Sequence, residues 1–166
     1  MYFGVNETIS WPRGFPLDHI LNKDAYNFKT CPNKVPLQNI AIIQSLANKQ
    51  PDVDGMYRLT RKTPFDFTSK IDDDLKNLVL PQNTFTPFNA QATLWKGGDL
   101  DVLALMLLPT TVHGRVSDIW RSYFVQWVFK HTNKRIVFSK AYIVQDRNVH
   151  NYWCFLVEKI EFYEIF

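Results

Sequence analysis

The placement of proline divides this 166-residue chain into two parts. All nine prolines lie at or before Pro109, and the last third of the chain contains none. Because proline removes a backbone N–H and restricts φ, it interrupts helices and central strands. The sequence therefore predicts short elements joined by loops up to residue 109, and longer regular structure after it.

Several stretches carry signals for individual elements. Apolar residues at helical spacing after Pro36 predict a helix that Pro51 ends. Alternation in residues 55–60 predicts a strand, and Asp99 is placed to cap a short helix that reaches Leu108. Further strands are predicted at residues 91–95, 135–139 and 141–145, and an amphipathic helix at residues 152–166.

The segment from His113 to His131 predicts a helix with an unusually charged beginning. Ser117 is a suitable N-cap, and Asp118 in the first turn is favoured by the helix dipole. Arg115 and Arg121 oppose that dipole, so we expect them to have another partner, either Asp118 or an anionic ligand such as a phosphate. The residues predicted to face a core are Ile119, Trp120, Tyr123, Phe124, Trp127 and Val128.

Composition restricts the class of protein. Hydrophobic residues make up 46% of the chain, which predicts one folded domain over residues 1–166. The net charge of +3 gives no argument for nucleic acid as a partner. Residues 1–10 lack the pattern of a signal peptide, and the longest apolar run, residues 102–108, is far shorter than the ~20 residues that cross a bilayer.

Two aspartates, Asp52 and Asp54, stand one residue apart in the stretch PDVDGMYRLTRK. In an extended loop both carboxylates project on one side, which suits a hard cation that holds a diphosphate. A turn before a strand explains the same residues, since aspartate and Gly55 are typical turn formers. Arg58 adds positive charge nearby, which suits phosphate and equally an ordinary solvated face.

Other polar residues are candidates for substrate contacts. Arg13 lies in the rigid loop WPRGFPLD, from which it can reach a phosphate or carboxylate, although a purely structural loop is an equal alternative. Asn89 and Gln91 both donate and accept hydrogen bonds, as sugar hydroxyls require, while turn chemistry is the alternative. His150 is a candidate ligand for metal or phosphate, but a single histidine in a loop is commonly neither.

Five motifs, taken together, resemble one family. In chain order they are WPRGFPLD, PDVDGMYRLTRK, LPQNTFTPFNAQATLW, LMLLPTTV and GRVSDIWRSYFVQ. From Trp11 to about Tyr152, these stretches resemble the plant STELLO glycosyltransferase-like proteins and their animal and protist relatives. More distantly, the chain is similar to the reversibly glycosylated polypeptides, the UDP-arabinose mutases.

The resemblance implies a GT-A-type glycosyltransferase, which transfers a sugar from a UDP-sugar donor to a glycan acceptor with Mn²⁺ or Mg²⁺. It also implies a location in the Golgi membrane or lumen, although the chain shows no anchor of its own. The nucleotide-binding half would precede Trp11. We therefore expect the acceptor-side, C-terminal part of a mixed sheet with flanking helices, of the α/β class, or α+β for a partial domain.

The resemblance also implies roles for individual residues. Asp118 is the expected catalytic base or acceptor-orienting acid. The expected metal ligands are Asp52, Asp54 and His150, although the two aspartates belong to a later signature than the family's own metal motif. The expected substrate-binding residues are Arg13, Asp54, Arg58, Asn89, Gln91, Arg115 and Arg121. The alternative function is a non-catalytic scaffold or interaction module in the Golgi, with a protein partner or self-association.

Overall fold

The computed structural model of this chain describes residues 10–22, 35–67, 77–148, 151 and 153. Its strands form one mixed sheet with the order β2-β4-β1-β3. The central strands β1 (Ile40–Lys49) and β4 (Arg135–Gln145) are parallel. The short strands β2 (Asn77–Val79) and β3 (Thr93–Trp95) pair antiparallel with them on the outside. The predicted mixed α/β class is confirmed.

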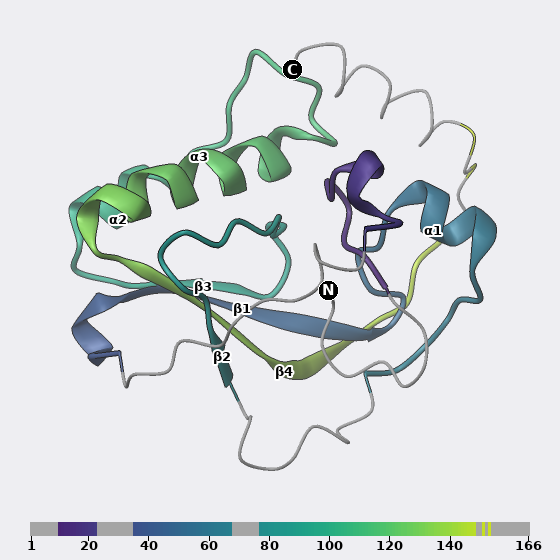
Figure 1. The fold of residues 1–166 in the computed structure, drawn as a ribbon, viewed down its shortest axis with the longest axis horizontal. Helices are drawn as coiled ribbons and strands as arrows, with labels where there is room; N and C mark the ends of the chain where they lie inside the picture. Colours follow the sequence, from purple (N-terminus) through teal and green to yellow (C-terminus); the bar gives the residue numbers. More distant parts are fainter. Residues whose placement is uncertain (1–9, 23–34, 68–76, 149–150, 152, 154–166) are drawn as a thin grey trace.

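Three α-helices accompany the sheet within the described residues. They are α1 (Gly55–Thr60), α2 (Leu100–Ala104) and α3 (Ser117–Thr132). Figure 1 shows α2 and α3 over one face of the sheet, and α1 near the end where β1 and β4 finish. Two short 3-10 turns, Leu17–His19 and Leu37–Asn39, complete the described elements.

Two hydrophobic clusters hold these elements together. The main core lies between the sheet and the helices α2 and α3, and its buried members are Ala41, Ile42, Leu46, Leu78, Leu80, Phe88, Val102, Val125, Phe129, Ile136 and Phe138. A smaller cluster joins Trp11, Val53 and Tyr57. Since Trp11 and Val53 lie close in sequence to Arg13 and Asp52, this second cluster fixes the loops that carry those two charges.

The helix predicted after Pro36 is wrong. A single 3-10 turn follows Pro36, and the chain then enters β1, the long strand paired on both sides. Apolar residues in this stretch satisfy helical and strand spacing at once, so periodicity does not separate the two. Pairing with β3 and β4 decides in favour of the strand.

The strand predicted at residues 55–60 is also wrong, because these residues form α1. Asp54 is the N-cap of this helix, and its Oδ1 accepts a hydrogen bond from the Met56 backbone N–H at 2.8 Å. An aspartate cap satisfies one of the N–H groups that a helix start leaves free. The aspartate that the sequence offers as a turn former therefore starts a helix.

Helix α3 begins at Ser117, where the N-cap was predicted, and its buried face was predicted only in part. Ile119 is buried as predicted, together with Ser122, Val125, Gln126 and Phe129. Phe124 and Trp127, also predicted to face a core, are 58% and 57% exposed, whereas Trp120, Tyr123 and Val128 are half-buried. Ser122 and Gln126 tolerate burial because both side chains are hydrogen-bonded. Ser122 donates to the Ile119 carbonyl at 2.6 Å, and Gln126 donates to the Ser122 and Thr86 carbonyls at 2.8 Å each. The predicted cap is wrong as well, since Val116 is the N-cap residue.

Other predicted elements are found with changed limits. The two late strands are one continuous strand, β4, and the strand predicted at residues 91–95 begins at Thr93. Asp99 caps α2 through the Val102 N–H at 3.2 Å, as predicted, but the helix ends at Ala104. The helix predicted at residues 152–166 lies outside the described residues, apart from Trp153. Of the helices that are described, none combines the length and apolar content required to cross a bilayer.

Candidate functional site

The polar residues of the candidate site gather beyond the carboxyl ends of the two central strands. Asp52 follows the end of β1, and Arg147 follows the end of β4. Because β1 and β4 are parallel neighbours, both ends lie at the same edge of the sheet. In open α/β sheets this edge is where ligands bind.

Asp52 is the centre of this cluster. Its side chain is only 6% exposed and is held by three different segments of the chain. Arg13 donates to it from Nε at 3.0 and 3.2 Å, Arg147 donates from a terminal nitrogen at 2.9 Å, and Asn89 donates from Nδ2 at 2.9 Å. Both carboxylate oxygens therefore have charged or amide donors.

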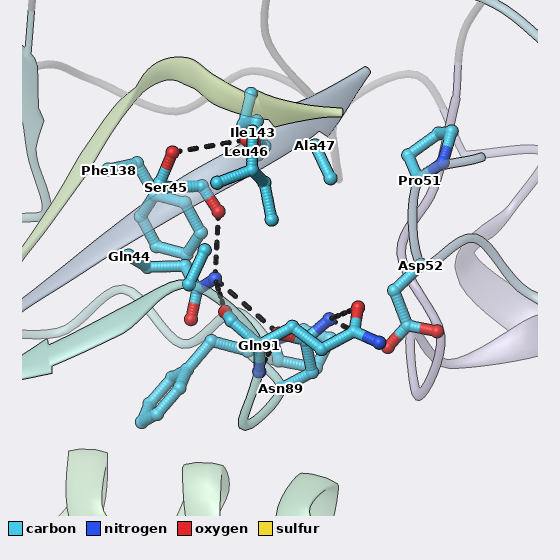
Figure 2. A pocket seen from close by; sticks show the side chains of 13 residues that line it. Gln44, Ser45, Leu46, Ala47, Pro51, Asp52, Asn89, Gln91, Phe138 and Ile143 are labelled. Atoms are coloured by element: carbon cyan, nitrogen blue, oxygen red, sulfur yellow. Dashed lines mark hydrogen bonds between the residues drawn. The ribbon is translucent and has the colours of Figure 1, made fainter. Parts of the chain in front are cut away.

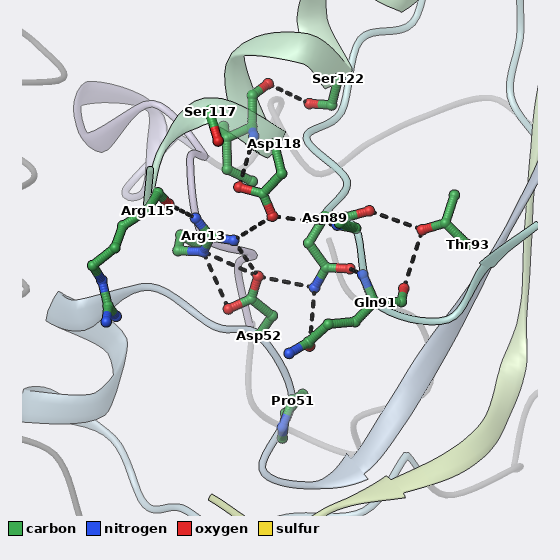
Figure 3. Close-up of polar contacts among 12 residues, drawn as sticks. Arg13, Pro51, Asp52, Asn89, Gln91, Thr93, Arg115, Ser117, Asp118 and Ser122 are labelled. Carbon is green, nitrogen blue, oxygen red and sulfur yellow. Dashed lines mark hydrogen bonds and ion pairs between the residues drawn. The ribbon is translucent and has the colours of Figure 1, made fainter. Parts of the chain in front are cut away.

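Arg13 joins Asp52 to the beginning of helix α3. Figure 3 shows its guanidinium between the carboxylates of Asp52 and Asp118. One terminal nitrogen lies 2.8 Å from Asp118 Oδ2 and 3.0 Å from Asp52 Oδ2, and the other donates to the Arg115 backbone carbonyl. Asp118 also accepts from the Ala90 N–H at 3.2 Å. The side chains of Arg13 and Asp118 are 25% and 14% exposed, so a ligand in solvent can reach both.

A network of amide and hydroxyl groups continues from this ion pair to strand β3. Asn89 Oδ1 accepts from the Gln91 N–H at 2.9 Å, and the buried Gln44 donates to the Gln91 carbonyl at 2.8 Å. Thr93 donates from Oγ1 to Gln44 Oε1 at 2.7 Å. These contacts fix the turn before β3, so that Asn89 and Gln91 are held against Asp52 (Figure 3).

A small open pocket lies against this network (Figure 2). Its lining includes Gln44, Asp52, Asn89 and Gln91 on one side, and apolar side chains from β1 and β4, including Ile143, on the other. The cavity volume is about 20 Å³, which is room for roughly one or two water molecules. The pocket is therefore a polar recess at the surface, and it is too small to enclose a sugar ring.

The charges of the cluster reinforce one another. Burial alone would raise the pKa of Asp52, but Arg13, Arg147 and the hydrogen bond from Asn89 hold it below the usual value of 3.8. Burial alone would lower the pKa of Arg13, and the carboxylates of Asp52 and Asp118 raise it above its usual value. At neutral pH both groups are therefore charged.

Two predicted site residues support the loop that carries Asp52. Arg58, only 9% exposed, donates to Gln50 Oε1 at 2.7 Å and to the Pro51 carbonyl. Asp54 is fully buried and caps α1, as described above. Both side chains brace the backbone on either side of Asp52.

The two remaining predicted arginines differ from each other. Arg115 is exposed, and its backbone carbonyl accepts a hydrogen bond from Arg13. Arg121 is buried, donates to the Met106 carbonyl at 2.8 Å and lies 5.2 Å from the centre of the Trp95 ring. Burial lowers its pKa, and Asp118 partly offsets that effect. Arg121 thus packs against Trp95 of β3 and the segment that follows α2.

The described part of the chain contains no set of side chains that is placed to bind the expected divalent cation. The oxygens of Asp52 are taken by Arg13, Arg147 and Asn89, and Asp54 caps a helix. Among the described residues, no group of three or more His, Cys, Asp or Glu side chains is placed to hold a metal ion. His150 lies outside those residues, so the predicted ligand set as a whole stays a prediction.

Three residues of the cluster escaped prediction as site residues. Arg147 stands two positions after a predicted strand, and its place beyond a strand end was a usable signal. Gln44 and Thr93 lie inside strands, where alternation indicates only which face they occupy. Their hydrogen bonds to the turn at Asn89 depend on the pairing of β1 with β3, which no local pattern reveals.

Comparison with known proteins agrees with the five motifs. No protein-family model matches the chain. The probable glycosyltransferase STELLO2 of Arabidopsis thaliana is 32% identical over 128 residues, which are 75% of this chain and 16% of the relative. The probable glycosyltransferase STELLO1 of the same plant is 29% identical over 163 residues, which are 90% of this chain and 20% of the relative. The chain belongs to the STELLO-like family.

Membership in the STELLO-like family covers most of this chain but a small part of its relatives. The chain spans no more than about a fifth of the length of the curated STELLO proteins it matches. The name probable glycosyltransferase belongs to those two relatives. Donor, acceptor and cellular location of this STELLO-like chain are matters for proposal.

Proposed function

We propose that this chain forms the acceptor-side site of a glycosyltransferase that moves a sugar from a UDP-sugar to a glycan acceptor in the Golgi. One observation carries the proposal. Four of the five motifs shared with the STELLO-like family each supply a residue to one cluster: Arg13, Asp52, Asn89 and Asp118. These residues are up to 105 positions apart in sequence. A family pattern that converges on one partly buried polar cluster supports a shared site.

Asp118 is the group of this cluster best placed to handle a hydroxyl. Its carboxylate has two oxygens with about four acceptor positions, and Arg13 and nearby backbone N–H groups leave some of them open. In the proposed step, the acceptor oxygen forms a bond to the anomeric carbon of the sugar. Its proton passes to Asp118, and the bond from that carbon to the phosphate oxygen breaks, with the electron pair leaving on the nucleoside diphosphate.

The neighbouring residues orient the reactants in this proposal. Arg13 lies against Asp118, where its hydrogen bond fixes the direction of the carboxylate. The carboxamides of Asn89 and Gln91 lie beside it at the polar recess, where they are suited to hydrogen-bond sugar hydroxyls. The recess is open, which suits an acceptor that extends beyond a single sugar.

The test compares Asp118→Asn with Asp146→Asn, a substitution of an exposed aspartate that forms an ion pair with Lys49. Both changes are made at the matching positions of a full-length relative, where we expect sugar transfer to fall by about 10²-fold or more in Asp118→Asn. Asp146→Asn should behave as wild type. Equal transfer by both folded variants would remove the catalytic role of Asp118.

A scaffold or interaction role is a second candidate, and helix α3 provides an observation in its favour. Phe124 and Trp127 are exposed on the helix, and their rings stack with centroids 6.5 Å apart. Large exposed aromatic groups mark interaction surfaces. A folded sample that binds neither UDP nor sugar, but loses self-association when Trp127 is replaced by Gln, would favour this role.

A further inference from the structure

The surroundings of Asp52 differ from those of a metal ligand. The side chain is 6% exposed, and its two oxygens receive donors from Arg13, Arg147 and Asn89 at 2.9 to 3.2 Å. Ligands of divalent cations present free carboxylate oxygens toward a common point. Here the carboxylate oxygens point into two guanidinium groups.

The neighbouring charges lead to the same conclusion. Among the described residues, two guanidinium groups, Arg13 and Arg147, lie directly against the Asp52 carboxylate. A divalent cation at Asp52 would stand a few ångströms from both groups, and the like charges would repel it. Asp54 is unable to help, because it is buried as the cap of α1.

We infer that Asp52 is a positioning residue and the counter-ion of Arg13 and Arg147. In this inference no metal binds at Asp52, and the two arginines supply the positive charge that meets an anionic ligand. The inference rests on the proposed function only for the identity of that ligand, a phosphate-bearing group. It also adds Arg147 to the site. The Arg147 side chain is 17% exposed, and its Nε has no hydrogen-bond partner among the described residues, so this side chain keeps donor capacity beyond its contact with Asp52.

The first experiment uses the wild-type protein, labelled with ¹⁵N. Asn89 Nδ2 lies 2.9 Å from Asp52 Oδ2, so a paramagnetic Mn²⁺ ion at Asp52 would broaden the side-chain amide signal of Asn89. We expect this signal to persist when Mn²⁺ is added. The side-chain amide of Gln82, which contacts Arg135 and the Lys130 carbonyl, is the control. Broadening of Asn89 at low Mn²⁺, with Gln82 unchanged, would overturn the inference.

The second experiment measures binding of inorganic pyrophosphate by calorimetry, in EDTA and in Mn²⁺. We expect the same affinity in both, and a loss of roughly tenfold or more in Arg147→Gln, since a charge-assisted hydrogen bond is removed. Arg135→Gln is the matched control, because Arg135 also has a buried Nε without a partner but pairs with Gln82. Unchanged binding in Arg147→Gln would contradict the role of Arg147.

The outcomes separate the inference from the proposed function. Pyrophosphate binding that requires Mn²⁺ overturns the inference and leaves the glycosyltransferase proposal in place. Metal-independent binding of pyrophosphate, without any binding of UDP or sugar transfer, supports the inference and contradicts the proposed function. No pyrophosphate binding under either condition overturns the inference.

A double-mutant cycle tests the positioning role of Asp52 directly. If Asp52 is the counter-ion, Arg147→Gln should lower the midpoint of urea unfolding in wild type but raise it or leave it unchanged in Asp52→Asn, where Arg147 has lost its anion. Additive effects would contradict the pairing.

Should Asp52→Asn fail to fold, the ¹⁵N signals of the arginine side chains in wild type give the same information. The Nε–H signals of Arg13 and Arg147 are expected to move together as Asp52 is titrated with acid, and an unchanged pair would count against the inference.

Discussion

At the scale of single residues, the site depends on one buried carboxylate. Asp52 is ionised although it is almost fully buried, because Arg13, Arg147 and Asn89 compensate the loss of water. Removing one partner of a buried ion pair leaves the other charge uncompensated, which costs about 3–5 kcal/mol. Asp52 is therefore expected to matter for stability as well as for the site.

This pairing predicts how stability depends on pH. The pKa of Asp52 in the folded state is below its usual value of 3.8, so its contribution is present above that value and is lost as the pH falls through the lower, folded-state pKa. We expect the free energy of unfolding to fall in wild type below about pH 4, and to fall less steeply in Asp52→Asn. Urea unfolding measured from pH 7 to pH 2 checks this. Equal slopes for the two proteins would show that Asp52 is not preferentially ionised in the folded state.

At the scale of elements, helix α3 has two stripes with the same spacing. One stripe is large and aromatic, and the sequence favours it as the core face. The buried stripe instead contains Ser122 and Gln126, whose side chains bond to backbone carbonyls within the helix and at Thr86. Their hydrogen bonds allow these polar side chains to be buried, and Phe124 and Trp127 are left on the outside.

This arrangement predicts opposite effects for two aromatic residues of α3. Phe129→Ala should lower the free energy of unfolding by about 3–5 kcal/mol, because Phe129 lies in the main core. Trp127→Gln should change it by no more than about 0.5 kcal/mol, because more than half of that side chain is exposed. Urea unfolding of both variants is the measurement. A large loss for Trp127→Gln would mean that the predicted aromatic face is buried after all.

At the scale of the whole molecule, the site is a junction of separate segments. The loop at Arg13 lies against the start of α3, and the Tyr123 hydroxyl donates to the Gly14 carbonyl at 2.9 Å. The Arg13 N–H also donates to the Asp52 carbonyl at 3.0 Å, which ties the same loop to the end of β1. The relative position of loop, strand end and helix therefore decides whether Arg13 reaches both carboxylates.

Gly14 makes this close approach possible, which leads to a prediction. Its φ is +84°, and a Cβ added there would lie 2.3 Å from Ile119 Cγ2. Gly14→Ala should therefore displace the loop from α3 and cost about 2 kcal/mol or more in unfolding free energy. Gly97→Ala is the control, since a Cβ at Gly97 has open space around it. Equal stability of the two variants would contradict the tight contact.

The sequence alone predicted which residue types form the site and which family the chain resembles. It did not predict which residues contact one another. Arg13, Asn89 and Asp118 were predicted to lie at one site, and the structure brings them together around Asp52. Capping at Asp99 was also predictable, because it depends on neighbours within a few residues. The hydrogen bonds of Asp52 could not be predicted from the sequence, because they join residues that are 37 to 95 positions apart.

Secondary structure before residue 61 and the orientation of α3 depended on long-range packing. The stretch after Pro36 is a strand because β3 and β4 pair with it, and residues 55–60 form a helix that packs Tyr57 against Trp11. In each case local patterns allowed two structures of similar free energy. Burial against distant segments chose between them, since the free energy gained there exceeds the small differences in local preference.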